Sequence, residues 1–345
     1  MADAPAPPVA KGERPTLKTI SRITGLAVPT VSRALNDAPD IGQETKRRVR
    51  AAAEEVGYLP NRAGVRLRTG RTNVISLVLT TEDDGMNYNS QLISSMLAAL
   101  RGTAYHVVVT PYFPSDDVLR PVEYIVETRS ADAVVLNQIT PRDPRVAYLM
   151  ARGFPFATHG RTEWLDRHAY FDFDNEAFGT LAVEALAARG RRNLIAIAPP
   201  MDQTYAMDMV RGLTGAAKSA GLQTRTLADA TSDDASAVID AALRRAIAAD
   251  GPVIDGVITA STNACMVAVD AMERAGRVTG VDFDIVAKEG TDFLRRFRRP
   301  ILTVREDVRD AGTSLAHAVL QMLKDPAAAP MQELRRPRGV LGARA

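Results

Sequence analysis

The sequence has a single cysteine, Cys265, among its 345 residues, so it cannot form an internal disulfide bond. Its four histidines do not fall at the spacing of a helical zinc site, and we expect neither a metal nor another cofactor. No apolar run is long enough to span a bilayer. Met1–Glu13 is an Ala/Pro-rich tail rather than a signal peptide. These absences together predict a cytoplasmic protein.

The sequence also lacks the residue patterns of an active site. Asp83-Asp84 and Asp116-Asp117 are typical of turns, and His159 and His168 have no matching nucleophile. No glycine-rich phosphate loop is present. We therefore expect a binding protein and not an enzyme.

Charge is distributed unevenly along the chain. Residues 1–72 hold 13 Lys and Arg against 7 Asp and Glu, a net of +6, whereas the remainder holds 30 against 34. With 46% hydrophobic residues, the length allows two or three folded domains. A basic N-terminal part on an acidic body predicts a polyanion-binding head. The alternative is a basic surface that only keeps the protein soluble.

Residues 16–36 predict two short helices separated by Gly25. Thr16 can cap the first helix, and glycine permits the sharp turn because it takes positive φ without a steric penalty. The second helix is expected from about Val28 to Leu35, with Pro29 tolerated in its first turn. This pattern predicts a helix-turn-helix, whereas the alternative is a plain helical hairpin. The exposed polar face comprises Thr30, Ser32, Arg33 and Asn36.

A third helix is expected from about residue 43 to 56, followed by a basic segment. Residues 61–73 carry Arg62, Arg66, Arg68 and Arg71 around one bulky apolar residue, Leu67. A helix of this length is unstable alone, so the segment is either a flexible linker or a hinge that folds only against DNA. In the second case Leu67 would insert between base steps of the minor groove.

Residues 16–73 contain a set of residues at characteristic spacing: Thr16-Leu17, Gly25-Leu26, Thr30 to Asn36, Glu44-Thr45, Ala52-Ala53, Gly57-Tyr58, Pro60-Asn61 and Leu67-Arg68. In this set the segment resembles the DNA-binding headpiece and hinge of the LacI/GalR (lactose repressor) family of bacterial transcriptional regulators. Two departures are Ala27, where the family has a capping serine, and Gly64, which replaces a hinge alanine.

The resemblance implies a set of DNA-contacting residues. Arg33 is the candidate for a bidentate guanine contact, and Val28 and Pro29 also read base edges. Leu67 matches the intercalating hinge leucine. Further members of the set position the head on phosphates or hold its helices and hinge in register: Thr16, Thr30, Ser32, Asn36, Thr45 and Asn61.

From residue 74 onward, apolar runs of strand length alternate with amphipathic helices. This pattern predicts parallel sheets covered on both faces, arranged in two successive halves with a ligand cleft at the carboxyl ends of the strands. Strands are expected near 74–80, 105–113, 131–136, 154–158, 194–198, 222–228, 253–260, 283–287 and 301–304. Helices are expected near 91–100, 117–128, 143–152, 175–189, 205–219, 233–249, 263–275 and 308–323.

The body resembles, more loosely, the sugar-binding core of the same family, which is similar to periplasmic binding proteins. The expected organisation is a tail (1–15), an all-α helix-turn-helix headpiece (16–60), a hinge (61–73) and an α/β two-lobed core for effector binding and dimerisation (74–345). By position, the resemblance implies an effector pocket formed by Tyr88, Asn89, Gln91, Arg161, Tyr205, Met209, Ser261, Asn263, Lys288, Glu289 and Glu306.

This pocket departs from the family pattern at several positions. Met209 stands where sugar-binding members have an arginine, Ser261-Thr262 replaces Asn-Asp, and Glu289 replaces an aspartate. Gly160 replaces the acidic residue before Arg161. Carboxylates and amides beside an aromatic face suit a polyhydroxylated ligand.

These observations predict a ligand-responsive repressor. A homodimer would bind a near-palindromic DNA operator, and a sugar or polyol bound between the lobes would control its operator affinity. The tail after Lys324 contains three prolines and no leucine heptads, which disfavours a coiled-coil tetramer. The alternatives are a family regulator controlled by a phosphorylated sugar or a protein co-regulator, and a solute-binding module with an incidental head.

Overall fold

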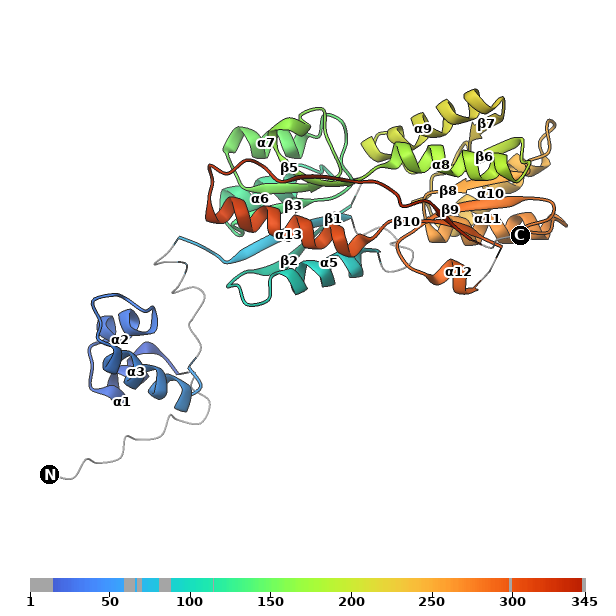
Figure 1. Ribbon diagram of the computed structural model, residues 1–345. Coiled ribbons are helices and arrows are strands. Elements are labelled where there is room, and N and C mark those ends of the chain that lie inside the picture. The colour runs from blue at the N-terminus through green and yellow to red at the C-terminus, as the bar shows by residue number, and fades with distance from the viewer. Residues whose placement is uncertain are drawn as a thin grey trace. The chain divides into compact units, whose positions relative to one another are not determined.

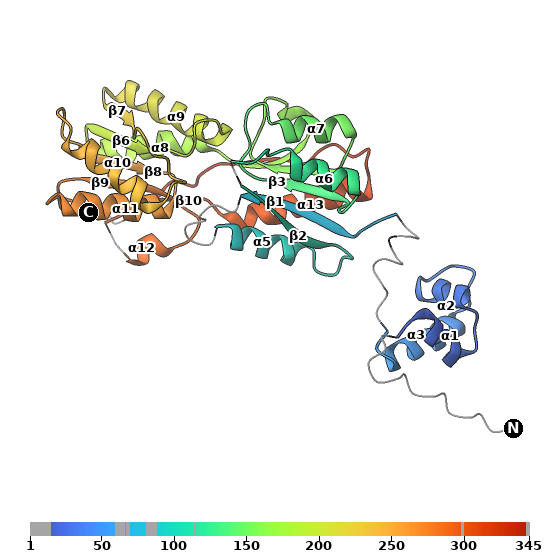
Figure 2. The same cartoon turned by 180° about the vertical axis from the view of Figure 1, so that it is seen from behind.

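The computed structural model describes residues 15–58, 66, 70–80, 88–113, 115–297 and 300–342. The chain divides into two compact units, Met1–Thr72 and Asn73–Ala345, and Figures 1 and 2 show it from opposite sides. In its described part the first unit is helical, whereas the second is built on two sheets.

The first unit contains, among its described residues, the helices α1 (Leu17–Thr24), α2 (Val28–Leu35) and α3 (Gln43–Glu55). These bounds confirm the predicted helix-turn-helix and third helix. Gly25 ends α1 with a φ of +67°, the left-handed conformation that the sequence predicts at this turn. The apolar faces of the helices meet in one small core, whose buried members are Ile20, Val31, Ala34, Val49, Ala52 and Ala53.

The starts of α1 and α2 are stabilised differently. Thr16 Oγ1 accepts a hydrogen bond from Thr19 N at 3.4 Å, and Thr16 N donates to Thr19 Oγ1 at 3.1 Å, which forms a capping box. Ala27, the N-cap residue of α2, makes no side-chain capping bond. Because Pro29 lies in the first turn, its missing N–H removes no helical bond. The position of α2 therefore depends on the packing of its buried face.

The predicted hinge falls mostly outside the described residues. Asn61 and Leu67 both lie outside them, so their expected DNA contacts stay predictions. Arg66 is described and helical, and its carbonyl oxygen accepts a hydrogen bond from Gly70 N at 2.8 Å.

The second unit consists of two α/β lobes. The first lobe contains β1 (Val74–Thr80), α5 (Tyr88–Ala99), β2 (His106–Tyr112), α6 (Arg120–Thr128), β3 (Ala133–Leu136), α7 (Pro144–Arg152), β4 (Phe156–His159), the 3-10 helix η1 (Leu165–Arg167), β5 (Ala169–Phe173), α13 (Val308–Lys324) and β11 (Gln332–Arg335). The second lobe contains α8 (Asn175–Ala188), β6 (Asn193–Ile197), α9 (Thr204–Ala220), β7 (Gln223–Thr226), α10 (Ser236–Ala248), β8 (Gly256–Thr259), α11 (Thr262–Arg274), β9 (Asp284–Glu289), α12 (Phe293–Phe297), β10 (Leu302–Arg305) and β12 (Val340–Leu341).

The two sheets have corresponding strand orders, β11-β5-β4-β3-β1-β2 and β12-β10-β9-β8-β6-β7. Neighbours from β1 to β5 are parallel, and so are neighbours from β6 to β10. Strands such as β3 and β8 are buried at every position, which explains their continuous apolar sequences. This arrangement confirms the predicted fold class.

The chain passes between the lobes three times: after β5, between β10 and α13, and between β11 and β12. In the first lobe, Leu315 and Val319 of α13 pack in one core with Leu92 and Met96 of α5, and both views show these helices side by side (Figures 1 and 2). Strand β11 is parallel to β5, whereas β12 is antiparallel to β10. Strands β5, β11 and β12 and helix α12 are not among the elements predicted from the sequence.

Helices α8 and α9 touch at two glycines. A Cβ atom on Gly212 would overlap the backbone of Glu176, and one on Gly179 would overlap the carbonyl oxygen of Met209. Gly215 also lies in α9, but a Cβ there meets nothing within 4 Å. The contact between these helices therefore depends on the absence of side chains at positions 179 and 212.

We predict that Gly212→Ala and Gly215→Ala have opposite effects on stability. The first forces α8 and α9 apart and should lower the free energy of unfolding by about 1–3 kcal/mol. The second should raise it by about 0.5–1 kcal/mol, because alanine loses less backbone entropy in a helix. Urea midpoints of the full chain, followed by far-ultraviolet circular dichroism, measure both. Equal midpoints for the two variants would contradict this explanation.

Candidate functional site

The residues predicted to form the recognition face lie on α2 and at its C-cap, where Arg33 and Asn36 are exposed and Thr30 and Ser32 are half-buried. Arg33 is exposed and pairs with Asp40, while Asn36 Nδ2 donates to the Ser32 carbonyl oxygen at 2.5 Å. Pro29 is exposed, and Val28 and Thr30 are half-buried at the start of the same helix. In this conformation a carboxylate thus compensates the charge of Arg33.

The third helix supplies both structural and exposed cations. Lys46 is buried, and its Nζ donates to the carbonyl oxygen of Asp37 at 3.2 Å. Arg48 Nη2 donates to the carbonyl oxygen of Thr24, which links α3 to the end of α1. Thr45 is half-buried in the first turn of α3. Cations on α3 therefore hold the three helices together as well as contributing to the basic surface.

The second unit contains a cavity of about 410 Å³ between its lobes, at the carboxyl ends of the strands. Residues from both lobes line it, together with the crossing segment after β10. Tyr88 and Asn89 lie in the first turn of α5, because this helix begins three residues earlier than the sequence predicts. The predicted residues that the structure brings together around the cavity are Tyr88, Asn89, Gln91, Tyr205, Ser261, Asn263, Lys288 and Glu306.

Three predicted residues do not line this cavity. Met209 is 1% exposed and packs in the core between α8, α9 and the second sheet, one turn deeper than Tyr205. Glu289 was expected after its strand but is the last residue of β9, so its side chain points away from that of Lys288. Glu289 Oε1 instead accepts from Leu294 N at 2.7 Å. Arg161 lies beside the cavity and binds two carboxylates.

A network of polar side chains forms one end of the cavity. Tyr88 Oη donates to Glu306 Oε1 at 3.3 Å and lies 3.1 Å from Nδ1 of His159. Lys288 Nζ lies 3.0 Å from Glu306 Oε2 and donates to Asn175 Oδ1 at 2.9 Å. Burial acts to raise the pKa of Glu306, but the charge of Lys288 lowers it below its usual value. Glu306 is therefore held as a carboxylate inside the protein.

The aromatic rings of this end contact the same lysine. Lys288 Nζ lies 5.3 Å from the ring centroid of Tyr205 and 5.7 Å from that of Phe173. Burial lowers the pKa of His159, so its ring is neutral at pH 7. The cavity thus offers carboxylate, amide, hydroxyl and aromatic groups to a ligand.

The other end of the cavity contains residues that the sequence analysis did not name. Arg145 is 2% exposed and binds Asp143 through Nε at 2.9 Å and Nη2 at 2.6 Å. Tyr112 Oη donates to Gln138 Oε1 at 3.1 Å. Among the described residues, neither Arg145 Nη1 nor Gln203 Oε1 has a hydrogen-bond partner. No local sequence pattern indicates these residues, since they come from strand β2, the loop after β3, the start of α7 and the segment before α9.

Acidic groups predominate in the cavity wall. The described residues that line it include two cations, Arg145 and Lys288, against six carboxyl groups. Asp233 Oδ2 accepts from Tyr205 Oη at 3.4 Å, and burial raises the pKa of Asp233. The carboxyl groups are those of Asp143, Asp172, Asp202, Asp233, Asp234 and Glu306.

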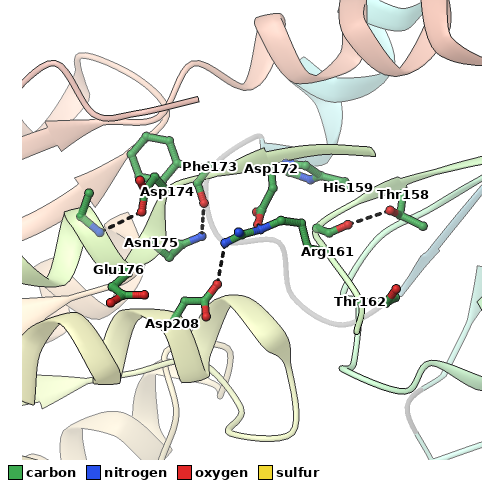
Figure 3. A network of polar contacts seen from close by, with 12 residues as sticks. Thr158, His159, Arg161, Thr162, Asp172, Phe173, Asp174, Asn175, Glu176 and Asp208 are labelled. Atoms are coloured by element: carbon green, nitrogen blue, oxygen red, sulfur yellow. Dashed lines mark hydrogen bonds and ion pairs between the residues drawn. The ribbon is translucent and has the colours of Figure 1, made fainter. Parts of the chain in front are cut away.

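Arg161 joins the lobes next to the first crossing (Figure 3). Its Nε donates to Asp172 Oδ2 in β5 at 2.7 Å, and its Nη2 donates to Asp208 Oδ2 in α9 at 2.8 Å. At the crossing itself, Asp174 caps α8 by accepting from Ala177 N at 3.0 Å, and Asn175 Nδ2 donates to the Phe173 carbonyl oxygen at 2.8 Å.

The described part of the chain offers neither a metal site nor a reactive thiol. No group of three or more His, Cys, Asp or Glu side chains there could hold a metal ion. Cys265 is buried, and burial raises its pKa to about 12, so it is protonated at neutral pH. None of the described helices is both long and apolar enough to span a bilayer.

Comparison with known proteins identifies both units. Residues 16–61 match the model of bacterial regulatory proteins of the lacI family, and residues 183–343 match a periplasmic binding protein-like domain. The chain is 30% identical over 337 residues to the HTH-type transcriptional regulator AglR of Rhizobium meliloti (strain 1021), covering 93% of this chain and 91% of that protein. It is 25% identical over 328 residues to CelR of Thermobifida fusca, covering 92% and 95%.

Solved structures share the fold. The Lac repressor dimer bound to operator and the anti-inducer ONPF superposes with a TM-score of 0.81 at 20% identity, covering 95% of this chain and 98% of that chain. The complex of the transcriptional regulator CelR with cellobiose gives a TM-score of 0.66 at 22% identity, with the same coverage. This protein therefore belongs to the lacI family of bacterial regulatory proteins and is a helix-turn-helix, DNA-binding transcriptional regulator.

Proposed function

We propose that this regulator is a cytoplasmic homodimeric repressor whose operator affinity is controlled by an uncharged sugar or polyol bound between its lobes. The observation that carries the proposal is the cavity between the lobes, whose wall combines carboxylates, amides, hydroxyls and aromatic rings from both lobes. Each hydroxyl of such an effector both donates and accepts, and this wall supplies partners of both kinds. The structural relative solved with cellobiose supports the same ligand class.

The acidic wall favours a neutral effector over a phosphorylated sugar. A phosphate carries negative charge at neutral pH and would enter a cavity that holds six carboxyl groups and two cations among its described residues. Both cations are already engaged, Lys288 with Glu306 and Arg145 with Asp143. A phosphate that replaced the carboxylate at either cation would have to separate one of these pairs inside the protein, which is costly.

Exposed apolar side chains support dimerisation. Strand β2 is the edge of the first sheet, and Val108 and Val109 on it are 43% and 42% exposed. Leu97 of α5 is 46% exposed. The structural relative on operator DNA is a dimer. Two copies would place two recognition helices in successive major grooves of a near-palindromic site. The competing possibility is that a protein co-regulator binds the exposed apolar side chains of α5 and β2.

Binding rather than catalysis is the proposed task of the cavity. Lys288 and Glu306 neutralise each other, and His159 is neutral and bonded to Tyr88. None of these groups activates a neighbouring nucleophile among the described residues.

If the effector changes the affinity for the operator, the operator must change the affinity for the effector by the same factor, because one coupling free energy links the two sites.

We expect Arg33→Ala to weaken operator binding about tenfold or more, because a bidentate contact to guanine is worth about 1–3 kcal/mol. Arg47→Ala is the matched control, since it removes the same charge from an exposed position on α3 where Arg47 pairs with Glu44. Fluorescence anisotropy would measure the affinity of each variant for a DNA duplex that the wild-type protein has selected from a random library. An equal loss in both variants would show that Arg33 contributes only charge.

Neutral saccharides, cellobiose among them, should raise the melting temperature of the full chain, whereas the corresponding sugar phosphates should not. Asn263→Ala removes an amide from the cavity wall and should reduce the shift produced by the best saccharide. Met209→Leu alters the core of the same lobe and should leave that shift unchanged. A screen in which only sugar phosphates stabilise the protein would contradict the proposed effector class.

A further inference from the structure

One arginine compensates a buried carboxylate in each lobe. Asp172 in the first lobe is 3% exposed and Asp208 in the second is 5% exposed. Arg161 donates to both, at 2.7 and 2.8 Å respectively, and lies between them (Figure 3). Moving the lobes apart would remove this partner from Asp208 and leave the arginine with one carboxylate. Because buried charges require compensation, this contact favours the arrangement of the lobes seen here.

The carboxylate in the first lobe also faces the effector cavity. Asp172 lines the cavity, and only its Oδ2 receives Arg161. Its Oδ1 has no hydrogen-bond partner among the described residues, and this oxygen atom is not completely buried. This oxygen is therefore accessible from the cavity. When ionised, it can only accept a hydrogen bond, as from the hydroxyl of a sugar or polyol.

The charged groups around Asp172 come from several elements. Arg161 follows β4, Asp208 lies on α9, and Glu306 follows β10. Burial raises the pKa of Asp172 to about 7, Arg161 acts to lower it, and Asp208 and Glu306 act to raise it further. The hydroxyl of Tyr88 on α5 also experiences the charge of Asp172.

The second oxygen of Asp208 has a partner within its own lobe. Arg211 Nη1 lies 2.8 Å from Asp208 Oδ1 and donates to Glu176 Oε2 at 2.9 Å. Since Arg211 and Asp208 are three residues apart on α9, this pair is unaffected by motion between the lobes. Arg161 and Arg211 therefore bind the same carboxylate at the same distance, but only Arg161 connects the lobes.

We propose that Arg161 is a positioning residue that couples the effector cavity to the arrangement of the lobes. It orients Asp172 so that Oδ1 accepts a hydroxyl of the effector, and it simultaneously holds the second lobe through Asp208. An effector bound to Asp172 then stabilises the arrangement that Arg161 maintains. This inference rests on the proposed binding of a hydroxylated effector between the lobes.

A backbone amide provides a readout that needs no ligand. Thr204 N donates to the carbonyl oxygen of Ile139 at 2.9 Å, and this hydrogen bond crosses from the second lobe to the first. Thr204 is the first residue of α9, where an amide has no acceptor within its own helix. Hydrogen exchange at this amide therefore reports contact between the lobes.

In the full chain, we expect Arg161→Met to accelerate hydrogen exchange at Thr204 about tenfold, because a charge-assisted bond between the lobes is lost. Arg211→Met should leave this rate within about twofold of wild type. Mass spectrometry with residue-level fragmentation, or amide-resolved NMR, would measure both variants. An unchanged rate in Arg161→Met, or equal acceleration in the two variants, would overturn the coupling.

The second arm uses the saccharide that gives the largest melting shift with wild-type protein. Asp172→Asn keeps an oxygen for Arg161, so hydrogen exchange at Thr204 should stay near the wild-type rate, while the affinity for the saccharide falls about tenfold.

The affinity of the wild-type protein for the saccharide should rise as pH increases through about 7, because the ionised Asp172 is the acceptor. Asp172→Asn should abolish this dependence, and Arg161→Met should move its midpoint to higher pH.

The outcomes separate this inference from the proposed function. If saccharides bind the wild-type protein and Asp172→Asn binds them equally well, the inference is wrong and the effector class stands. If no saccharide stabilises the wild-type protein, the proposed effector class is wrong. The exchange rates at Thr204 then decide alone whether Arg161 connects the lobes.

Discussion

Compensation of buried carboxylates is the constraint on which the body of this regulator depends. Removing a carboxylate from water is unfavourable unless cations or several donors replace the lost solvation. Asp172 and Asp208 share Arg161, and Glu306 is paired with Lys288. These groups lie close to where the chain crosses between the lobes. The same charge pairs therefore influence both the relative position of the lobes and the polar groups that the cavity wall offers to a ligand.

Local chemistry made the head predictable from sequence. The cap at Thr16, the turn at Gly25 and the tolerated Pro29 each act within a few residues, so short segments carry enough information to place them. Long apolar runs likewise indicated two parallel sheets, because strands covered on both faces must be apolar throughout. In contrast, β11 is short and half-exposed and pairs with β5, more than 150 residues earlier in the chain. No local pattern identifies such a strand.

The cavity was predictable in location but not in its full set of residues. The family resemblance implied Tyr205, Lys288, Met209 and Glu289 as pocket residues; the first two line the cavity, whereas the last two do not. The direction of a side chain depends on helix phase and strand alternation, and a shift of one or two residues in an expected boundary reverses it. Asp172 was missed because its strand was not predicted.

The first lobe is discontinuous in sequence, since α13 and β11 complete it from the end of the chain. During synthesis, residues 74–173 emerge long before Leu315 and Val319, which pack in their core. The second lobe, apart from its short β12, is encoded without interruption. Its core can therefore assemble on the ribosome while the first lobe still exposes apolar surface. Completion of the first lobe, and with it of the effector cavity, must await α13 and β11, which are translated after most of the second lobe.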